Sequence, residues 1–87
     1  MKFVNIGFGN MVCADRIITI ATPDSEPIKR LVRDAKDDGR VIDVSCGRRT
    51  RTVIVADSDH IILSALSVEK IAARISGDES EDNDDEE

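Results

Sequence analysis

The sequence has few of the residues from which a large core or a disulfide framework is built. Its 87 residues include no tryptophan, no tyrosine and only two phenylalanines, so the core must consist of Val, Ile, Leu and Ala side chains. The two cysteines form no CxxC motif and no disulfide framework, which suits a reducing cytoplasm. Because a chain of this length buries a modest fraction of its surface, we expect one small domain that associates with further copies of itself.

Long apolar runs are absent as well. No run reaches the roughly 18 apolar residues that a membrane-spanning helix needs. The first ten residues, MKFVNIGFGN, are interrupted by Asn and Gly before the apolar region of a secretory signal could form. We therefore expect a cytoplasmic protein without a membrane partner.

Negative charge is abundant, but it is concentrated at one end of the chain. The formal net charge is −6, and residues 78–87, DESEDNDDEE, hold eight of the 18 acidic residues and none of the 12 basic ones. Residues 1–77 therefore have 12 basic and 10 acidic residues, a formal charge of +2. Since a block of like charge cannot bury apolar surface, we predict a folded domain over 1–77 and a disordered acidic tail over 78–87.

Hydrophobic periodicity predicts two helices. In the first, Asp24 or Ser25 can cap the start, Pro27 falls in the first turn as a structural residue, and Gly39 ends the helix. Its apolar residues recur at i, i+3, i+4 and i+7, at Ile28, Leu31, Val32 and Ala35. The second helix begins after Ser67 and ends at Gly77, with the same spacing at Val68, Ile71, Ala72 and Ile75.

Five strands complete an α+β domain of order ββαβββα, with a small and mostly antiparallel sheet. They are expected at KFVNI, at MVCADRIITIAT as one strand bent near Asp15, and at RVIDVS, TRTVIVA and HIILSAL. Gly7, Gly9 and Gly47 are assigned structural roles in turns. RIITI, TVIVA and HIIL are apolar at consecutive positions, which is typical of a sheet covered on both faces. Two short helices do not obviously cover both faces, so this pattern predicts an oligomer.

Two motifs invite a catalytic or ligand-binding interpretation that their context does not support. Gly7-Phe8-Gly9 would need a third glycine where Val12 stands, so it is better explained as a turn between strands. His60 follows Asp-Ser-Asp, but these residues are typical of a hairpin turn and no other histidine is available as a ligand. We predict no catalytic residue, no metal, no cofactor and no small-molecule substrate, and hence no enzyme.

The stretch CGRRTRTVIVA, residues 46–56, places Arg48, Arg49 and Arg51 within four positions at the start of a strand. A turn does not need arginine, whereas the planar guanidinium suits phosphate oxygens and guanine edges. Thr50 and Thr52 would add hydroxyl donors for phosphate. The cluster therefore predicts either a nucleic-acid or other polyanion site, or a set of salt bridges between subunits.

A basic helix face is the second candidate for phosphate contact. Lys29, Arg30, Arg33 and Lys36 lie on it, mixed with Glu26, Asp34 and Asp37. The i, i+4 pairs of opposite charge are equally typical of an ordinary solvated face. We treat Lys29 and Arg33, together with Thr50, as accessory phosphate contacts.

Four motifs carry a resemblance to a known family. NIGFGN, PIKRLVRDAK, VIDVSCGRRTR and DSDHIILSAL, in this order and spacing, resemble the RemA family of bacterial extracellular-matrix regulatory proteins over about residues 3–75. The resemblance implies a DNA-binding transcriptional regulator that activates matrix (biofilm) and osmoprotection genes. It also implies a LytTR-like fold, a ring-shaped homo-oligomer, and DNA binding through Arg16, Arg48, Arg49 and Arg51. Asp15 departs from the Asn that often precedes the first of these arginines.

As a hypothesis, a ring repeats a few weak arginine contacts along double-stranded DNA, and linked sites gain affinity without new contacts. With no obvious recognition helix, specificity would come from the shape of A·T-rich promoter DNA. Two alternatives stay open: a structural or protein-interaction ring that does not bind DNA, and an RNA-binding module. The scarcity of aromatic residues argues against RNA binding by base stacking.

Overall fold

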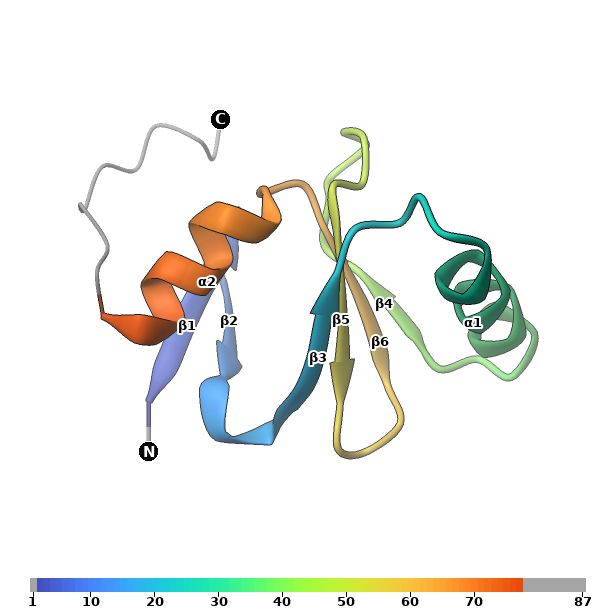
Figure 1. The fold of residues 1–87 in the computed structure, drawn as a ribbon, viewed down its shortest axis with the longest axis horizontal. Coiled ribbons are helices and arrows are strands. Elements are labelled where there is room, and N and C mark those ends of the chain that lie inside the picture. Colours follow the sequence, from blue (N-terminus) through green and yellow to red (C-terminus); the bar gives the residue numbers. More distant parts are fainter. Residues whose placement is uncertain (1, 78–87) are drawn as a thin grey trace.

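The computed structural model describes residues 2–77, which form an α+β domain (Figure 1). The predicted acidic tail, residues 78–87, lies outside the described residues. In chain order the elements are β1 (Phe3–Gly7), β2 (Asn10–Cys13), the 3-10 turn η1 (Ala14–Arg16), β3 (Ile17–Ala21), α1 (Glu26–Asp37), β4 (Val41–Asp43), β5 (Thr52–Ala56), β6 (Ile61–Ser64) and α2 (Val68–Ser76). The α+β class and both helices are confirmed.

The helix boundaries follow the capping residues that the sequence predicts. Ser25 caps α1, its hydroxyl accepting from the Ile28 amide, and Pro27 lies in the first turn. Ser67 caps α2 by accepting from the Lys70 amide at 3.1 Å. Beyond the ends of the helices, Gly39 and Gly77 adopt φ of +73° and +87°, a region that glycine enters without a Cβ clash.

The prediction of one bent strand over residues 11–22 is wrong. The stretch expected as one bent strand is split by η1 into β2 and β3, which belong to different sheets. β1 and β2 form a two-stranded antiparallel hairpin, while β3, β5, β6 and β4 form a four-stranded sheet in that order. Most pairs are antiparallel as predicted, but β4 and β6 run parallel, since α1 returns the chain to the far edge of the sheet.

The chain itself covers both faces of the central strands, which corrects the reason given for expecting an oligomer. One face of β5 and β6 packs against α1, with Ala35, Val53, Ile61 and Leu63 at its centre. The opposite face packs against α2 and the β1–β2 hairpin through Val4, Ile6, Ile54, Ile62, Leu66 and Ile71. Figure 1 shows the sheet between α1 and the layer of α2 and the hairpin. The consecutive apolar residues of β5 and β6 are therefore explained within one chain, whereas those of β3 are only partly covered.

Uncovered apolar side chains remain on the outer strands of the sheet. Ile18 on β3 is 64% exposed and Ile42 on β4 is 45% exposed. These two strands form the edges of the four-stranded sheet, where unpaired backbone groups are also available. Exposed apolar side chains thus lie on both edge strands of the sheet, and Phe3 and Met11 add two more on the β1–β2 hairpin.

Candidate nucleic-acid interface

The three clustered arginines lie on a short turn between β4 and β5. Cys46 and Gly47 adopt φ of +56° and +80°, which reverses the chain before the exposed Arg48 and Arg49. The Arg48 amide donates to the Ser45 carbonyl at 3.0 Å. Before the turn, Asp43 Oδ1 accepts from the Ser45 amide at 2.9 Å and from the Ser45 hydroxyl at 2.7 Å. The turn that presents the arginines is therefore closed by local hydrogen bonds.

Asp43 should make this turn sensitive to acid. The hydroxyl and then the amide of Ser45 stabilise the ionised carboxylate and lower the pKa of Asp43 below its usual value. A lowered folded-state pKa adds stability that is present above the unfolded pKa of about 3.9 and is lost as pH falls through the folded pKa. We expect Asp43→Asn to cost about 0.5 kcal/mol at pH 7, after allowance for solvent screening, and progressively less as the pH falls through the folded-state pKa of Asp43.

Urea unfolding of both proteins at pH 7, 4.5 and 2.5 measures this difference. Asp37→Asn removes an exposed carboxylate on α1; it is the matched control and should change the free energy of unfolding at pH 7 by less than about 0.5 kcal/mol. A constant difference between wild type and Asp43→Asn at every pH would contradict the assignment.

Buried hydroxyls fix the start of β5 against the rest of the fold. The Thr52 hydroxyl donates to the Leu66 carbonyl at 2.6 Å, and Ser64, its partner in the β5–β6 register, donates to the Ile6 carbonyl at 2.8 Å. Both residues are completely buried. The suggestion that Thr52 contacts phosphate is therefore wrong, because its hydroxyl faces inward and already has an acceptor.

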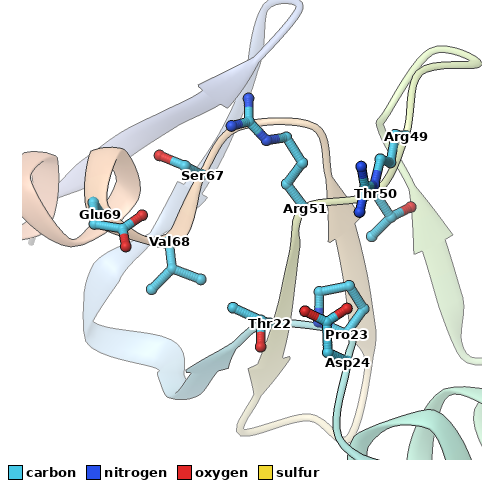
Figure 2. A pocket seen from close by; sticks show the side chains of 9 residues that line it. All are labelled: Thr22, Pro23, Asp24, Arg49, Thr50, Arg51, Ser67, Val68 and Glu69. Atoms are coloured by element: carbon cyan, nitrogen blue, oxygen red, sulfur yellow. The ribbon is translucent and has the colours of Figure 1, made fainter.

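A depression of 280 Å³ opens between the arginine turn, the start of α1 and the start of α2 (Figure 2). It is lined by Thr22, Pro23, Asp24, Arg49, Thr50, Arg51, Ser67, Val68 and Glu69. In Figure 2, Arg51 extends from the start of β5 toward the α2 side, while Arg49 and Thr50 lie on the opposite side. Among residues 2–77, the side chains of Arg49 and Arg51 have no ion pair or hydrogen bond. Two guanidinium groups are therefore available to an external anion, with Asp24 and Glu69 moderating the local positive charge.

A second depression, of 220 Å³, continues from the first along α1. It is lined by Pro23, Lys29, Val32, Lys36, Thr50, Val53 and Leu63. Pro23 and Thr50 belong to both depressions, so Lys29 lies on a surface continuous with the arginines. Arg33 lines neither of the two. Lys36 was placed on the basic helix face but was not chosen as an accessory contact, although its i, i+7 spacing from Lys29 puts both on one side of the helix.

Arg16 does not join the other three arginines within one chain. β3 runs antiparallel to β5, with Ile17 opposite Ala56, so the start of β3 lies at the opposite end of the sheet from Arg51 (Figure 1). Arg16 Nε donates to Asp57 Oδ2 at 2.7 Å, and this hydrogen bond and charge raise the pKa of Arg16. Arg16 therefore belongs to a separate surface that includes the 57–60 turn.

The hairpin tip contributes a residue that the sequence interpretation assigned only to a turn. The ring of Phe8 lies 5.6 Å from Arg48 Cζ, within the range of a cation–π contact. The sequence does not predict this contact, because residues 8 and 48 are far apart in the chain and come together only in the folded structure.

The Asp-Ser-Asp-His stretch forms a structural turn. Asp57 is engaged by Arg16, and Ser58 Oγ lies 2.8 Å from His60 Nδ1. Within the described part of the chain, no three His, Cys, Asp or Glu side chains gather as a metal ion would require. In the same range, residues 2–77, no helix is long and apolar enough to cross a membrane.

Comparison of the sequence with known proteins identifies the family of this chain. The model of the RemA-like family, described as extracellular matrix regulatory protein A-like, matches residues 3–75. A protein of Geobacillus thermodenitrificans is 58% identical over 77 residues, 88% of either chain. One of Carboxydothermus hydrogenoformans is 54% identical over 82 residues, 94% of either chain, and one of Dictyoglomus thermophilum is 58% identical over 82 residues, 94% of this chain and 96% of the other. All three are named "Putative regulatory protein". Since the family model spans nearly all the described residues and relatives exceed half identity, the chain belongs to the RemA-like family.

Proposed function

We propose that this protein is a cytoplasmic regulator that binds double-stranded DNA through Arg48, Arg49 and Arg51. The observation that carries the proposal is the pair of exposed guanidinium groups, Arg49 and Arg51, that lack partners among residues 2–77 and line one depression. Arginine in this arrangement suits phosphate oxygens, with which it forms charge-assisted hydrogen bonds. Thr50 and Lys29, on the continuous surface, supply further phosphate contacts, and Arg33 is kept as an accessory contact from α1.

Because one subunit has only a modest positive charge, we expect several subunits to contact the DNA together. Asp24 and Glu69 share the depression with the arginines, so a single copy offers little net positive potential. A ring of copies presents the same contacts side by side, which raises the affinity through effective concentration. The exposed Ile18 and Ile42 on the sheet edges support self-association, and the ring and LytTR-like arrangement implied by the family are part of the proposal. Arg16 lies at the other end of the sheet, so it contacts the same DNA only if ring assembly places it beside the arginines of a neighbouring subunit.

The family supports a role in gene regulation. Its description refers to extracellular matrix regulation, and the relatives' names refer to regulatory proteins. Control of matrix and osmoprotection genes through A·T-rich promoter DNA is the form of this role that we propose. In the absence of an obvious recognition helix, sequence preference would come from DNA shape and deformability.

Binding to a short duplex, measured by fluorescence anisotropy against salt concentration, tests the proposal. Each phosphate neutralised contributes a slope of about 0.9 in log affinity against log salt, so two contacts predict a roughly tenfold loss between about 50 and 200 mM salt. Light scattering in the same buffer gives the oligomeric mass. Absence of duplex binding by an intact oligomer would favour the structural ring, and displacement of the duplex by single-stranded RNA would favour the RNA-binding alternative.

A further inference from the structure

The tip of the β1–β2 hairpin has an unusual backbone. Three successive residues, Gly7, Phe8 and Gly9, have φ of +111°, +55° and +80°. Glycine enters this region freely, but a bulky side chain such as that of Phe8 is strained there. A residue that keeps such a conformation needs surroundings that enforce it, and strain of this kind gathers at functional sites.

Side chains of the same hairpin enforce the conformation of the tip. Asn5 Oδ1 accepts from the Gly7 amide at 2.7 Å. From the other strand, Asn10 Nδ2 donates to the carbonyls of Gly7 and Phe8 at 3.0 and 3.3 Å. The tip also rests on the core, because a Cβ at Gly7 would meet Leu66 Cγ at 3.5 Å. The direction of the Phe8 side chain is therefore set by the fold.

The strained tip meets a second strained turn. The partly buried Phe8 ring lies 5.6 Å from Cζ of Arg48, which follows Cys46 and Gly47, both at positive φ. A ring at this distance attracts the guanidinium through its quadrupole. Two turns with left-handed backbone thus converge on one aromatic–arginine contact.

Arg48 has an aromatic ring beside its guanidinium group, and Arg49 has none among the described residues. A long side chain without a fixed partner loses rotamer freedom when it binds, and a ring that holds it beforehand reduces that loss. A narrow minor groove, as in A·T-rich DNA, attracts arginine and accepts it only in a restricted direction. An oriented arginine suits this groove, whereas a freely moving arginine suits phosphates along any sequence.

We propose that Phe8 is a positioning residue that orients Arg48 for insertion into the minor groove of A·T-rich DNA, so that this pair supplies the sequence preference. The inference rests on the proposed DNA binding and names the specificity device of that site. In this division of roles, Arg49 and Arg51 provide affinity on any sequence, and Phe8 with Arg48 provides discrimination.

The test compares an A·T-rich and a G·C-rich duplex of equal length by fluorescence anisotropy at one salt concentration. Phe8→Asn removes the ring, and Asn tolerates positive φ better than Phe, so its melting temperature should equal or exceed that of the wild type. Its preference for A·T-rich DNA should nevertheless fall about fivefold. A purely structural role for Phe8 predicts the reverse, a lower melting temperature with unchanged preference, and would overturn the proposal.

A double-mutant cycle sharpens the result. Because Phe8 acts through Arg48, adding Phe8→Asn to Arg48→Ala should reduce the preference no further, and additive losses would overturn the proposal. Phe8→Leu keeps an apolar side chain of similar size and should lose the preference as well, which covers the case of a poorly folded Asn variant. Phe3→Leu changes the other aromatic residue of the sequence, which lies in β1 and is 51% exposed; it is the matched control and should keep the wild-type preference.

The outcomes separate the two proposals. A wild type that binds neither duplex removes the proposed function, and this inference with it. A wild type that binds both duplexes equally, or a Phe8→Leu variant with full preference, overturns the role of Phe8 while DNA binding stands.

Discussion

Arg49→Ala should abolish detectable duplex binding at about 150 mM salt while the oligomeric mass stays the same. Arg49 is exposed and has no side-chain partner among residues 2–77, so its removal should not disturb the fold. Removal of one arginine that binds DNA weakens binding by about 1–3 kcal/mol. Because every subunit on the DNA lacks the same arginine, two subunits at about 1.4 kcal/mol each predict a roughly 100-fold weaker affinity. Anisotropy titrations in a salt series, with light scattering in parallel, measure both quantities.

The control for this variant is another exposed arginine with the same charge. Arg30→Ala on α1 removes one positive charge outside both depressions and should weaken binding only slightly. In Arg49→Ala, the slope of log affinity against log salt should become shallower by about 0.9 for each phosphate that is no longer neutralised. A variant that binds normally would disprove the assignment of Arg49, and one that falls to monomers would favour salt bridges between subunits.

The helices could be predicted from local signals in the sequence. The strand pairing could not, because it depends on residues that are far apart in the chain. Ser25 and Ser67 act on the first turn of their own helix, so each cap can be recognised from adjacent residues. The choice of partner strand depends on the whole chain. For this reason the sequence indicated the bend near Asp15 but not the division of that stretch between two sheets, nor the parallel pairing of β4 with β6. The consecutive apolar residues correctly indicated a sheet covered on both faces, but periodicity cannot tell which chain provides the cover.

The candidate site shows the same limit. Arg49 and Arg51 could be singled out because a turn has no need of them, and the structure leaves both accessible. Thr52 follows directly in the sequence but faces the core, since alternate residues of a strand point to opposite sides. Arg16 was grouped with the cluster on family resemblance, and the antiparallel register of β3 and β5 separates it. The contact of Phe8 with Arg48 needs the tertiary fold and had no sequence signal.

Ser64→Ala should lower the free energy of unfolding by about 2–4 kcal/mol, a large share of the roughly 4–11 kcal/mol expected for a domain of this size. The Ser64 hydroxyl donates to the Ile6 carbonyl at 2.8 Å and accepts from the Leu66 amide at 3.1 Å. Ile6 lies where the β1–β2 register shifts. Ile6 and Leu66 are 2% and 3% exposed, so alanine would leave a buried carbonyl and a buried amide without the hydroxyl that now joins them. Urea unfolding followed by circular dichroism measures the loss.

Ser76→Ala is the matched control, because the exposed Ser76 hydroxyl donates to the Ala73 carbonyl at 3.0 Å near the end of α2. This substitution should change the free energy of unfolding by less than about 0.5 kcal/mol. Equal effects of the two variants would show that the buried hydroxyl does not tie the sheet to the hairpin. Ser64 also accepts the Arg51 amide through its backbone carbonyl at 2.9 Å, which alanine preserves. Ser64→Ala should therefore retain duplex binding wherever it remains folded, which separates the stability of the scaffold from the chemistry of the arginines.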